Sequence, residues 1–167
     1  MVAFRAARPD EIETIRAIER ASAQRFLGIM DALAADEPSP ATVLAARIAS
    51  GGLLVATDGD DLVAFVMFEA VEDRAYVEQI DVLPVHEGRR IGAALLDVVS
   101  GRARKAGLKG LSLSTFKDVP WNAPYYRWLG FADVADDALT PGMRAIREAH
   151  LARGLDEAAR VFMVRDF

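Results

Sequence analysis

The chain has 167 residues, 25 of them acidic and 20 basic, and its net charge is −5 at pH 7; it contains no cysteine. The missing cysteines exclude disulfides, thiolate metal sites and a cysteine nucleophile, and the acidic balance argues against nucleic acid as a partner. No apolar run approaches the roughly 18 residues of a membrane span, and charges come too early for a signal peptide, so we expect a cytoplasmic protein without membrane attachment.

The length predicts a single domain over residues 1–167. A short strand is expected near 2–9, followed by a helix over 9–26 with isoleucines at helical spacing. A second helix is expected within 37–52, with Ser39 as its cap and Gly51 and Gly52 as its stop.

The hydrophobic period then changes. Residues 53–84 predict three strands joined by turns at "TDGDD" and "EAVEDR". A long helix over about 89–106, a strand over 109–116, a short helix within 119–131 and a final helix and strand complete the chain. Because hairpins precede a strand–helix–strand unit, this order predicts an α+β sheet covered by helices rather than a doubly wound sheet.

The loop in "DVLPVHEGRRIGAALLDVV", residues 81–99, combines glycine, positive charge and a new helix N-terminus. Such an N-terminus offers unpaired N–H groups and partial positive charge, and glycine lets an anion approach the backbone. We therefore predict an anion cradle over residues 88–93, although a plain helix entry fits the spacing equally well. The P-loop and dinucleotide patterns are absent, which excludes those nucleotide sites.

The segment "VLPVHEGRRIGAALL" resembles the pyrophosphate-binding segment of the GNAT superfamily of acyl-CoA-dependent N-acyltransferases, with Val82, Pro84 and Gly92 in register. Glu87 stands where glutamine or arginine is usual, and Arg90 stands where glycine is usual. A positive φ at Arg90 would cost about 1 kcal/mol. We expect Arg90 to lie in the helical region instead, where its side chain fits without strain.

A second segment, "WNAPYYRWLGF", resembles the family's N…Y-x-x-x-G-F segment, with Tyr126 five residues before Phe131. The resemblance is tight over residues 76–131. It implies a GNAT-like α+β fold, with a mixed, mostly antiparallel central sheet and helices on both faces. It also implies acetyl-CoA as co-substrate.

By this resemblance, the N–H groups of residues 88–93 bind the pyrophosphate, and the pantetheine arm runs along the backbone of residues 81–83 like an added strand. The N–H of Val82 would polarise the thioester carbonyl. The expected cofactor-binding residues are Asp81, Val82, Leu83, Glu87, Gly88, Arg89, Arg90, Gly92, Ala93 and Asn122.

Tyr126 is the expected general acid for the departing thiolate, with core packing as the alternative and Tyr125 as its competitor. Glu78 is the expected general base for the acceptor amine, unless it forms a salt bridge with an arginine. Strand alternation would place Glu78 on one face with Tyr76, Ile80 and Val82. Asp81, the second choice, would then face the opposite way.

Without a cysteine or a G-x-S-x-G elbow, direct attack in a ternary complex is expected. The two histidines form no metal motif, so no metal is expected. The acceptor is predicted to be a small-molecule or peptide primary amine. Protein N-termini or lysines as acceptors, and a CoA-binding module without catalysis, stay open, as does a homodimer formed through the final apolar strand.

Overall fold

The structure is a computed structural model that describes residues 1–167. Its seven strands form one sheet in the order β1-β2-β3-β4-β5-β7-β6. Their bounds are β1 Val2–Ala6, β2 Leu53–Asp58, β3 Asp61–Val71, β4 Arg74–Val82, β5 Gly110–Phe116, β6 Ala132–Val134 and β7 Arg160–Asp166. β4 and β5 pair in parallel, whereas β1–β2, β2–β3, β5–β7 and β6–β7 are antiparallel. The predicted α+β class with a mixed, mostly antiparallel sheet is confirmed.

The chain divides into two compact units, and each is assembled from two chain segments. The first unit comprises Met1–Glu69 and Glu78–Val99, and the second comprises Ala70–Val77 and Ser100–Phe167. Three elements run from one unit into the other, namely β3, β4 and helix α4, which spans Ile91–Lys105. That the whole chain is one domain stays a prediction.

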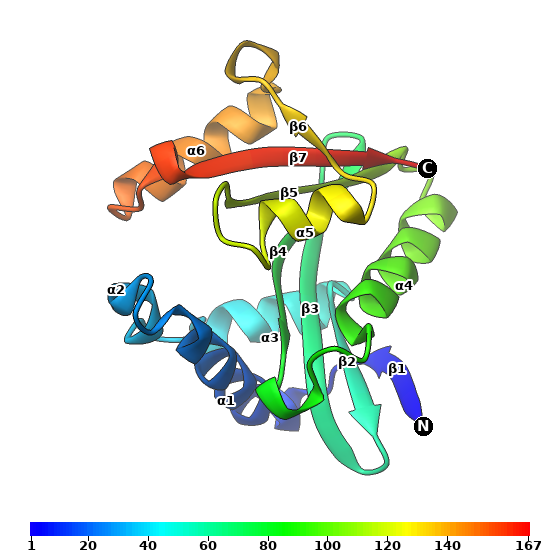
Figure 1. Ribbon diagram of the computed structural model, residues 1–167. Helices are drawn as coiled ribbons and strands as arrows, with labels where there is room; N and C mark the ends of the chain where they lie inside the picture. The colour runs from blue at the N-terminus through cyan, green and yellow to red at the C-terminus, as the bar shows by residue number, and fades with distance from the viewer. The chain divides into compact units, whose positions relative to one another are not determined.

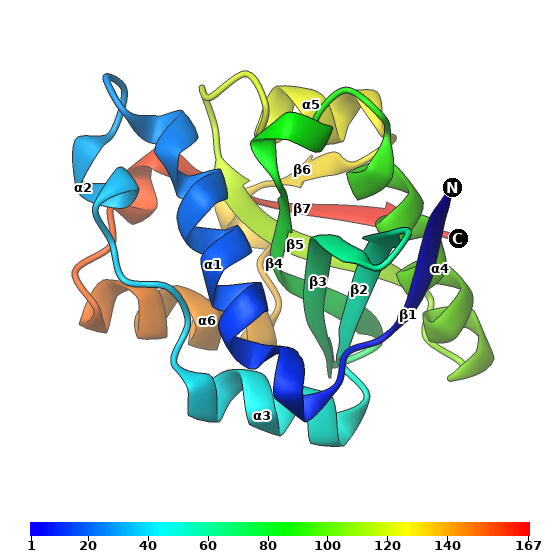
Figure 2. The same cartoon turned by 90° about the horizontal axis from the view of Figure 1, so that it is seen from below.

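In the first unit, α1 (Ile12–Ala23) and α3 (Ala41–Ser50) lie next to each other against one side of β2 and β3 (Figures 1 and 2). The short α2, Asp31–Ala34, lies between them in the chain. The isoleucines expected at helical spacing do face the core. One apolar cluster joins the helices to the strands, with Ile15, Ile18, Leu44, Leu53, Val55, Phe65 and Met67 buried in it.

The end of α3 follows the sequence prediction, but its beginning does not. Gly51 takes a left-handed φ of +78° at the C-cap, as the Gly-Gly stop predicts. A Cβ on Gly52 would lie 2.2 Å from the Phe68 carbonyl oxygen, so only glycine fits there. Ser39 does not cap α3. Pro40 takes that position, and the backbone and hydroxyl of Ser39 instead donate to Glu19 of α1.

In the second unit, α5 (Ala123–Trp128) and α6 (Pro141–Ala152) lie on opposite faces of β5 and β7 (Figure 1). On the α6 face, Tyr76, Met143 and Phe162 are buried together. Arg165 lies on the other face of β7, where it covers the Phe131 ring and donates to the Leu129 carbonyl. β6 is a three-residue edge strand that the sequence analysis did not predict, since it is too short to show an alternating pattern.

The turn between β3 and β4 contains a strained residue. Glu72 has φ of +55°, a conformation that glycine adopts readily and that costs other residues about 1 kcal/mol. The sequence "VEDR" offers no glycine for this turn.

Candidate active site

The loop between β4 and α4 contains two left-handed residues. Pro84–His86 forms a single 3-10 turn, Gly88 has φ of +76° and Arg90 has φ of +60°, directly before α4 begins at Ile91. The expectation of a helical Arg90 is therefore wrong. The chain enters α4 through a backbone conformation that suits glycine. A residue with a Cβ, such as Arg90, pays about 1 kcal/mol of backbone strain in this conformation.

The N-terminus of α4 presents a row of backbone donors. The Ala94 N–H bonds to the Arg90 carbonyl at 3.0 Å, and no backbone carbonyl accepts from the N–H groups of Gly88, Arg89, Gly92 or Ala93. These donors lie at the positive end of a 15-residue helix. Such an arrangement suits phosphate oxygens, which accept several hydrogen bonds and carry negative charge.

Charged side chains of this loop are bonded elsewhere. Arg89 donates to Asp58 at 2.8 Å and contacts His86 Nδ1. The hydrogen bond from Arg89 holds the pKa of Asp58 below its usual range. Glu87 forms an ion pair with Arg25 at 3.3 Å. The anion-binding capacity of the loop therefore rests on its amides rather than on the Arg89 side chain.

The backbone at the end of β4 is only partly available to a ligand. The Leu83 N–H donates to the Val63 carbonyl at 2.8 Å, and the Leu83 carbonyl accepts from His86 at 2.8 Å. Successive strand residues direct their backbone groups to opposite edges. The backbone groups of Asp81 and Leu83 therefore face β3, and those of Val82 face away from β3. The ladder that β4 forms with β5 ends at Val77, so Val82 has no strand partner on its edge. Of the three expected pantetheine contacts, this geometry supports Val82.

Glu78 forms the salt bridge that the sequence analysis weighed against a catalytic role. Arg47 of α3 donates both Nε and Nη2 to the Glu78 carboxylate, and the same Nη2 lies 3.0 Å from Glu69. The hydrogen bond with Glu78 raises the pKa of Arg47. A role of Glu78 as base would require it to exchange this partner for the acceptor.

Asp81 is held by two neutral donors. Ser22 of α1 donates to Oδ1 at 2.9 Å, and Gln79 donates to Oδ2 at 2.7 Å. Burial raises the pKa of Asp81 to about 7, the two hydrogen bonds oppose that rise, and the nearby charge of Glu19 adds to it. Burial likewise raises the pKa of Glu19.

The two carboxylates face the same layer of helices. Glu78 contacts α3 and Asp81 contacts α1, and both helices pack on one side of the first unit. Gly92 of α4 lies nearest to Ile80 and Val82 instead. The expectation that Glu78 shares a face with Ile80 and Val82, opposite to Asp81, is therefore wrong, because β4 does not keep strict alternation at this point.

Tyr126 lies on α5 with 9% of its surface exposed. Its ring meets Phe131 edge-on at 5.6 Å and Tyr125 at 5.7 Å, whereas Tyr125 stacks on Trp128. Asn122 stands directly before α5, and its Oδ1 is buried without a hydrogen-bond partner. The roles of Tyr126 and Asn122 stay predictions.

Sequence reasoning missed the residues that contact the two carboxylates, namely Ser22, Arg47 and Gln79. Gln79 could have been found as the polar neighbour of Asp81 in the same strand. Ser22 and Arg47 carry no such signal, since they lie 59 and 31 positions away from their partners.

Two further properties of the chain concern metals and membranes. No cluster of three or more histidine, aspartate or glutamate side chains is arranged to hold a metal ion. None of the helices has the length and apolar character to cross a membrane.

Comparison with known proteins agrees with the fold. The sequence model of the acetyltransferase (GNAT) family matches residues 15–131. A similar fold occurs in PaiA N-acetyltransferase from Thermoplasma acidophilum in complex with coenzyme A, with a TM-score of 0.76 and 15% identity over 100% of this chain and 99% of that one. N-acetylglutamate synthase from Neisseria gonorrhoeae, complexed with coenzyme A and N-acetyl-glutamate, has a TM-score of 0.76 and 18% identity over 99% of this chain and 35% of that one.

The ribosomal-protein-S18-alanine N-acetyltransferase from Escherichia coli is similar with a TM-score of 0.67 and 17% identity, over 99% of this chain and 94% of that one. At these low identities the solved structures establish the fold.

Proposed function

The chain belongs to the acetyltransferase (GNAT) family, and from this premise we propose that it transfers an acetyl group from acetyl-CoA to a primary amine by direct attack in a ternary complex. The observation that carries this proposal is the row of unbonded N–H groups at the start of α4, in the segment that the family uses for pyrophosphate. The structures of PaiA N-acetyltransferase and N-acetylglutamate synthase, which have similar folds, contain coenzyme A, and this supports the same donor.

The residues of the loop fit a pyrophosphate in shape and charge. Gly88 and Gly92 carry no side chain that could block the approach, and a Cβ on Gly88 would meet no atom within 4 Å. The Val82 N–H, on the unpaired edge of β4, is the proposed donor to the thioester carbonyl. The thioester supplies the activated acetyl group, and the protein supplies the fixed amides around it.

A base must take a proton from the acceptor, because an alkylammonium with a pKa of about 10.4 cannot attack. Glu78 is the base that the sequence favours, yet Arg47 holds both of its oxygens. Both oxygens of Asp81 also accept hydrogen bonds, but from the neutral Ser22 and Gln79, and its pKa of about 7 suits proton transfer near neutral pH. We therefore add Asp81 as the stronger candidate for the general base. Glu78 and Arg47 would then act only as a neighbouring ion pair.

Tyr126 is the proposed general acid for the thiolate. A phenol can give a proton to a thiolate when the two lie within hydrogen-bonding reach. Its burial against Phe131 holds the ring in place, and the neighbouring Tyr125 offers a matched comparison.

The deciding experiment measures donor binding and transfer separately. Titration calorimetry with acetyl-CoA should give binding, and release of CoA thiol should be followed over a panel of polyamines, aminoglycosides and peptides with free N-termini or lysines. Absence of binding at millimolar acetyl-CoA would overturn the proposal. Binding without thiol release for any amine would instead indicate a CoA-binding module.

The acid and base assignments have their own test on the best acceptor of that panel. We expect Tyr126→Phe to lower kcat by about 10²-fold or more, whereas Tyr125→Phe keeps most activity. If Asp81 is the base, Asp81→Asn lowers kcat by a similar factor and Glu78→Gln lowers it less. The opposite order would return the role to Glu78.

A further inference from the structure

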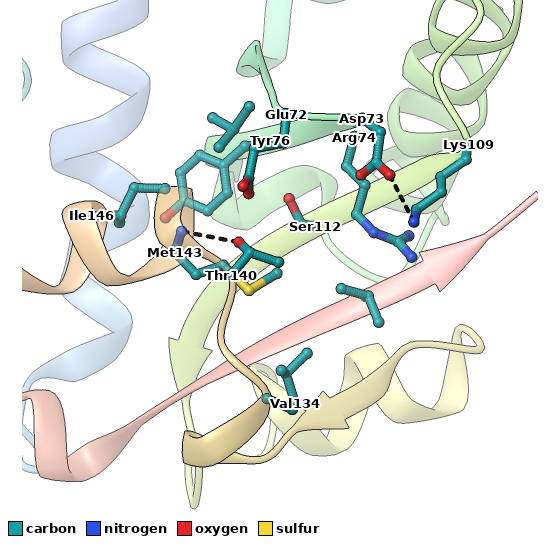
Figure 3. A pocket seen from close by; sticks show the side chains of 13 residues that line it. Glu72, Asp73, Arg74, Tyr76, Lys109, Ser112, Val134, Thr140, Met143 and Ile146 are labelled. Carbon is teal, nitrogen blue, oxygen red and sulfur yellow. Dashed lines mark hydrogen bonds and ion pairs between the residues drawn. The ribbon is translucent and has the colours of Figure 1, made fainter.

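A cavity of about 410 Å³ lies in the second unit, between α6 and the face of β4, β5 and β7 (Figure 3). Its volume falls in the range of small-molecule pockets. None of the residues that line it belongs to the 78–93 segment or to α5, so it is separate in composition from the proposed transfer site. Its wall is largely aliphatic, with Val71, Val134, Met143, Ile146 and Val164 contributing.

Two polar groups of the lining have no protein partner. The Glu72 carboxylate and the Ser112 hydroxyl both point into the cavity (Figure 3), and neither forms a hydrogen bond or ion pair within the chain. Ser112 is only 3% exposed, whereas Glu72 is exposed to solvent. A buried hydroxyl usually finds a partner, and a bound ligand would supply one to Ser112.

The cationic residues of the lining are already neutralised. Arg74 donates to Asp166 and to the carbonyls of Leu111 and Arg165, and Lys109 forms an ion pair with Asp73 at 2.6 Å. The charge that remains at the cavity is that of Glu72. An anionic ligand would therefore meet the unpaired Glu72 carboxylate, whereas a cation would find a counter-charge there.

The backbone holds Glu72 in place at a cost. Its φ of +55° is strained, and Gly142 of α6 makes room for it, since a Cβ on Gly142 would lie 2.8 Å from Glu72 Oε1 and 2.7 Å from Val71 Cγ1. The turn between β3 and β4 thus fixes the position from which the Glu72 side chain reaches the cavity.

We propose that this cavity binds an amphipathic primary amine, with its ammonium group on Glu72 and Ser112 and its aliphatic part against Val71, Met143 and Ile146. The inference concerns binding alone and does not depend on acetyl transfer. An uncharged apolar ligand would fill the same wall but would leave the buried Ser112 hydroxyl without a partner.

The test uses n-hexylamine as the probe and 1-hexanol as its neutral counterpart, at pH 7 and without acetyl-CoA. Chemical shifts of the Met143 methyl group, followed by NMR in the intact protein, report binding at the cavity itself. We expect hexylamine to shift this signal and to bind at least tenfold more tightly than hexanol. Equal affinity of the two probes, or no shift at Met143, would overturn the proposal.

Variants separate the charge of Glu72 from its structural role. Glu72→Gln should weaken hexylamine about tenfold and leave hexanol unchanged, and Ser112→Ala should weaken hexylamine severalfold. Glu72→Gly relieves the backbone strain, so it should fold well and still lose the preference for the amine. Glu148→Gln, an exposed carboxylate of α6 outside the lining, is the matched control and should change neither probe. Unchanged hexylamine affinity in Glu72→Gln and Glu72→Gly would refute the assignment.

Discussion

At the scale of single residues, Arg90 and Asp81 differ most from what their positions in the sequence suggest. Arg90 lies in a glycine-like conformation, and Asp81 is a half-buried carboxyl between two neutral donors. Both features lie beside the proposed donor site, where strain and shifted pKa values commonly occur.

Arg90→Gly should stabilise the protein by about 0.5 kcal/mol, because relief of the left-handed strain exceeds the added chain entropy of glycine. Chemical denaturation of the variant and the parent measures the difference. Arg90→Ala keeps the Cβ and the strain, so it serves as the control and should show no such gain. A destabilised Arg90→Gly variant would mean that the arginine side chain contributes more than its backbone strain costs.

The raised pKa of Asp81 predicts a pH dependence of stability. Its folded-state pKa of about 7 exceeds the ordinary value of 3.8, so the protonated carboxyl favours the folded state. That contribution is fully present below about pH 4 and is lost as the pH rises through 7. Asp81→Asn should remove this loss and gain at least about 1 kcal/mol over the parent at pH 8.

Unfolding by denaturant at pH 4, 6 and 8 would measure the pH dependence. Its control is Asp31→Asn, which alters an exposed carboxylate of α2. A parent and an Asp81→Asn variant with parallel pH profiles would show that Asp81 titrates normally.

At the scale of elements, the junction between α3 and β2 depends on two adjacent glycines in different ways. Gly51 needs its left-handed φ but has open space around its Cβ position, whereas the Cβ position of Gly52 faces the Phe68 carbonyl. The first requirement is conformational and the second is steric. The end of the helix and the beginning of the strand are thus set by separate causes.

We expect Gly51→Ala to cost about 1 kcal/mol through its left-handed φ. Gly52→Ala should cost more, about 2–3 kcal/mol, because the backbone of β3 must move. Equilibrium denaturation of the two variants, compared with each other, measures this difference. Equal costs would contradict the close approach of Gly52 to β3.

At the scale of the whole molecule, two compact units share three continuous elements. β3 changes unit after Glu69, β4 after Val77 and α4 after Val99. A unit could therefore unfold alone only by breaking these elements in the middle. This connectivity supports the single-domain prediction and makes it testable.

Thermal unfolding should be a single transition whose calorimetric and van't Hoff enthalpies agree. Leu44→Ala in the first unit and Phe162→Ala in the second remove side chains at most 2% exposed, and each should cost about 2–5 kcal/mol. Both variants should lower the same transition. Two separate transitions, each shifted by one variant, would show instead that the units unfold independently.

Cytoplasmic location, the homodimer and the absence of nucleic-acid or membrane partners stay predictions.

The family and the fold class were accessible from the sequence because each depends on local order. Strands and helices follow from hydrophobic period, and the family resemblance follows from motifs within short segments. The role of the loop before α4 in binding the donor stays a prediction. β6 was not predicted, because a strand of three residues is too short to show an alternating hydrophobic pattern.

The sequence by itself determined the order of the longer elements, the stop of α3 at Gly51 and the start of a helix after the 88–90 loop, because neighbouring residues specify turns and helix ends. Only the tertiary structure decided that Arg47 holds Glu78, that Ser22 holds Asp81 and that Glu72 faces a cavity under α6. These contacts join positions far apart in the chain, and burial then sets the charge state of the groups that meet. No local pattern encodes either effect.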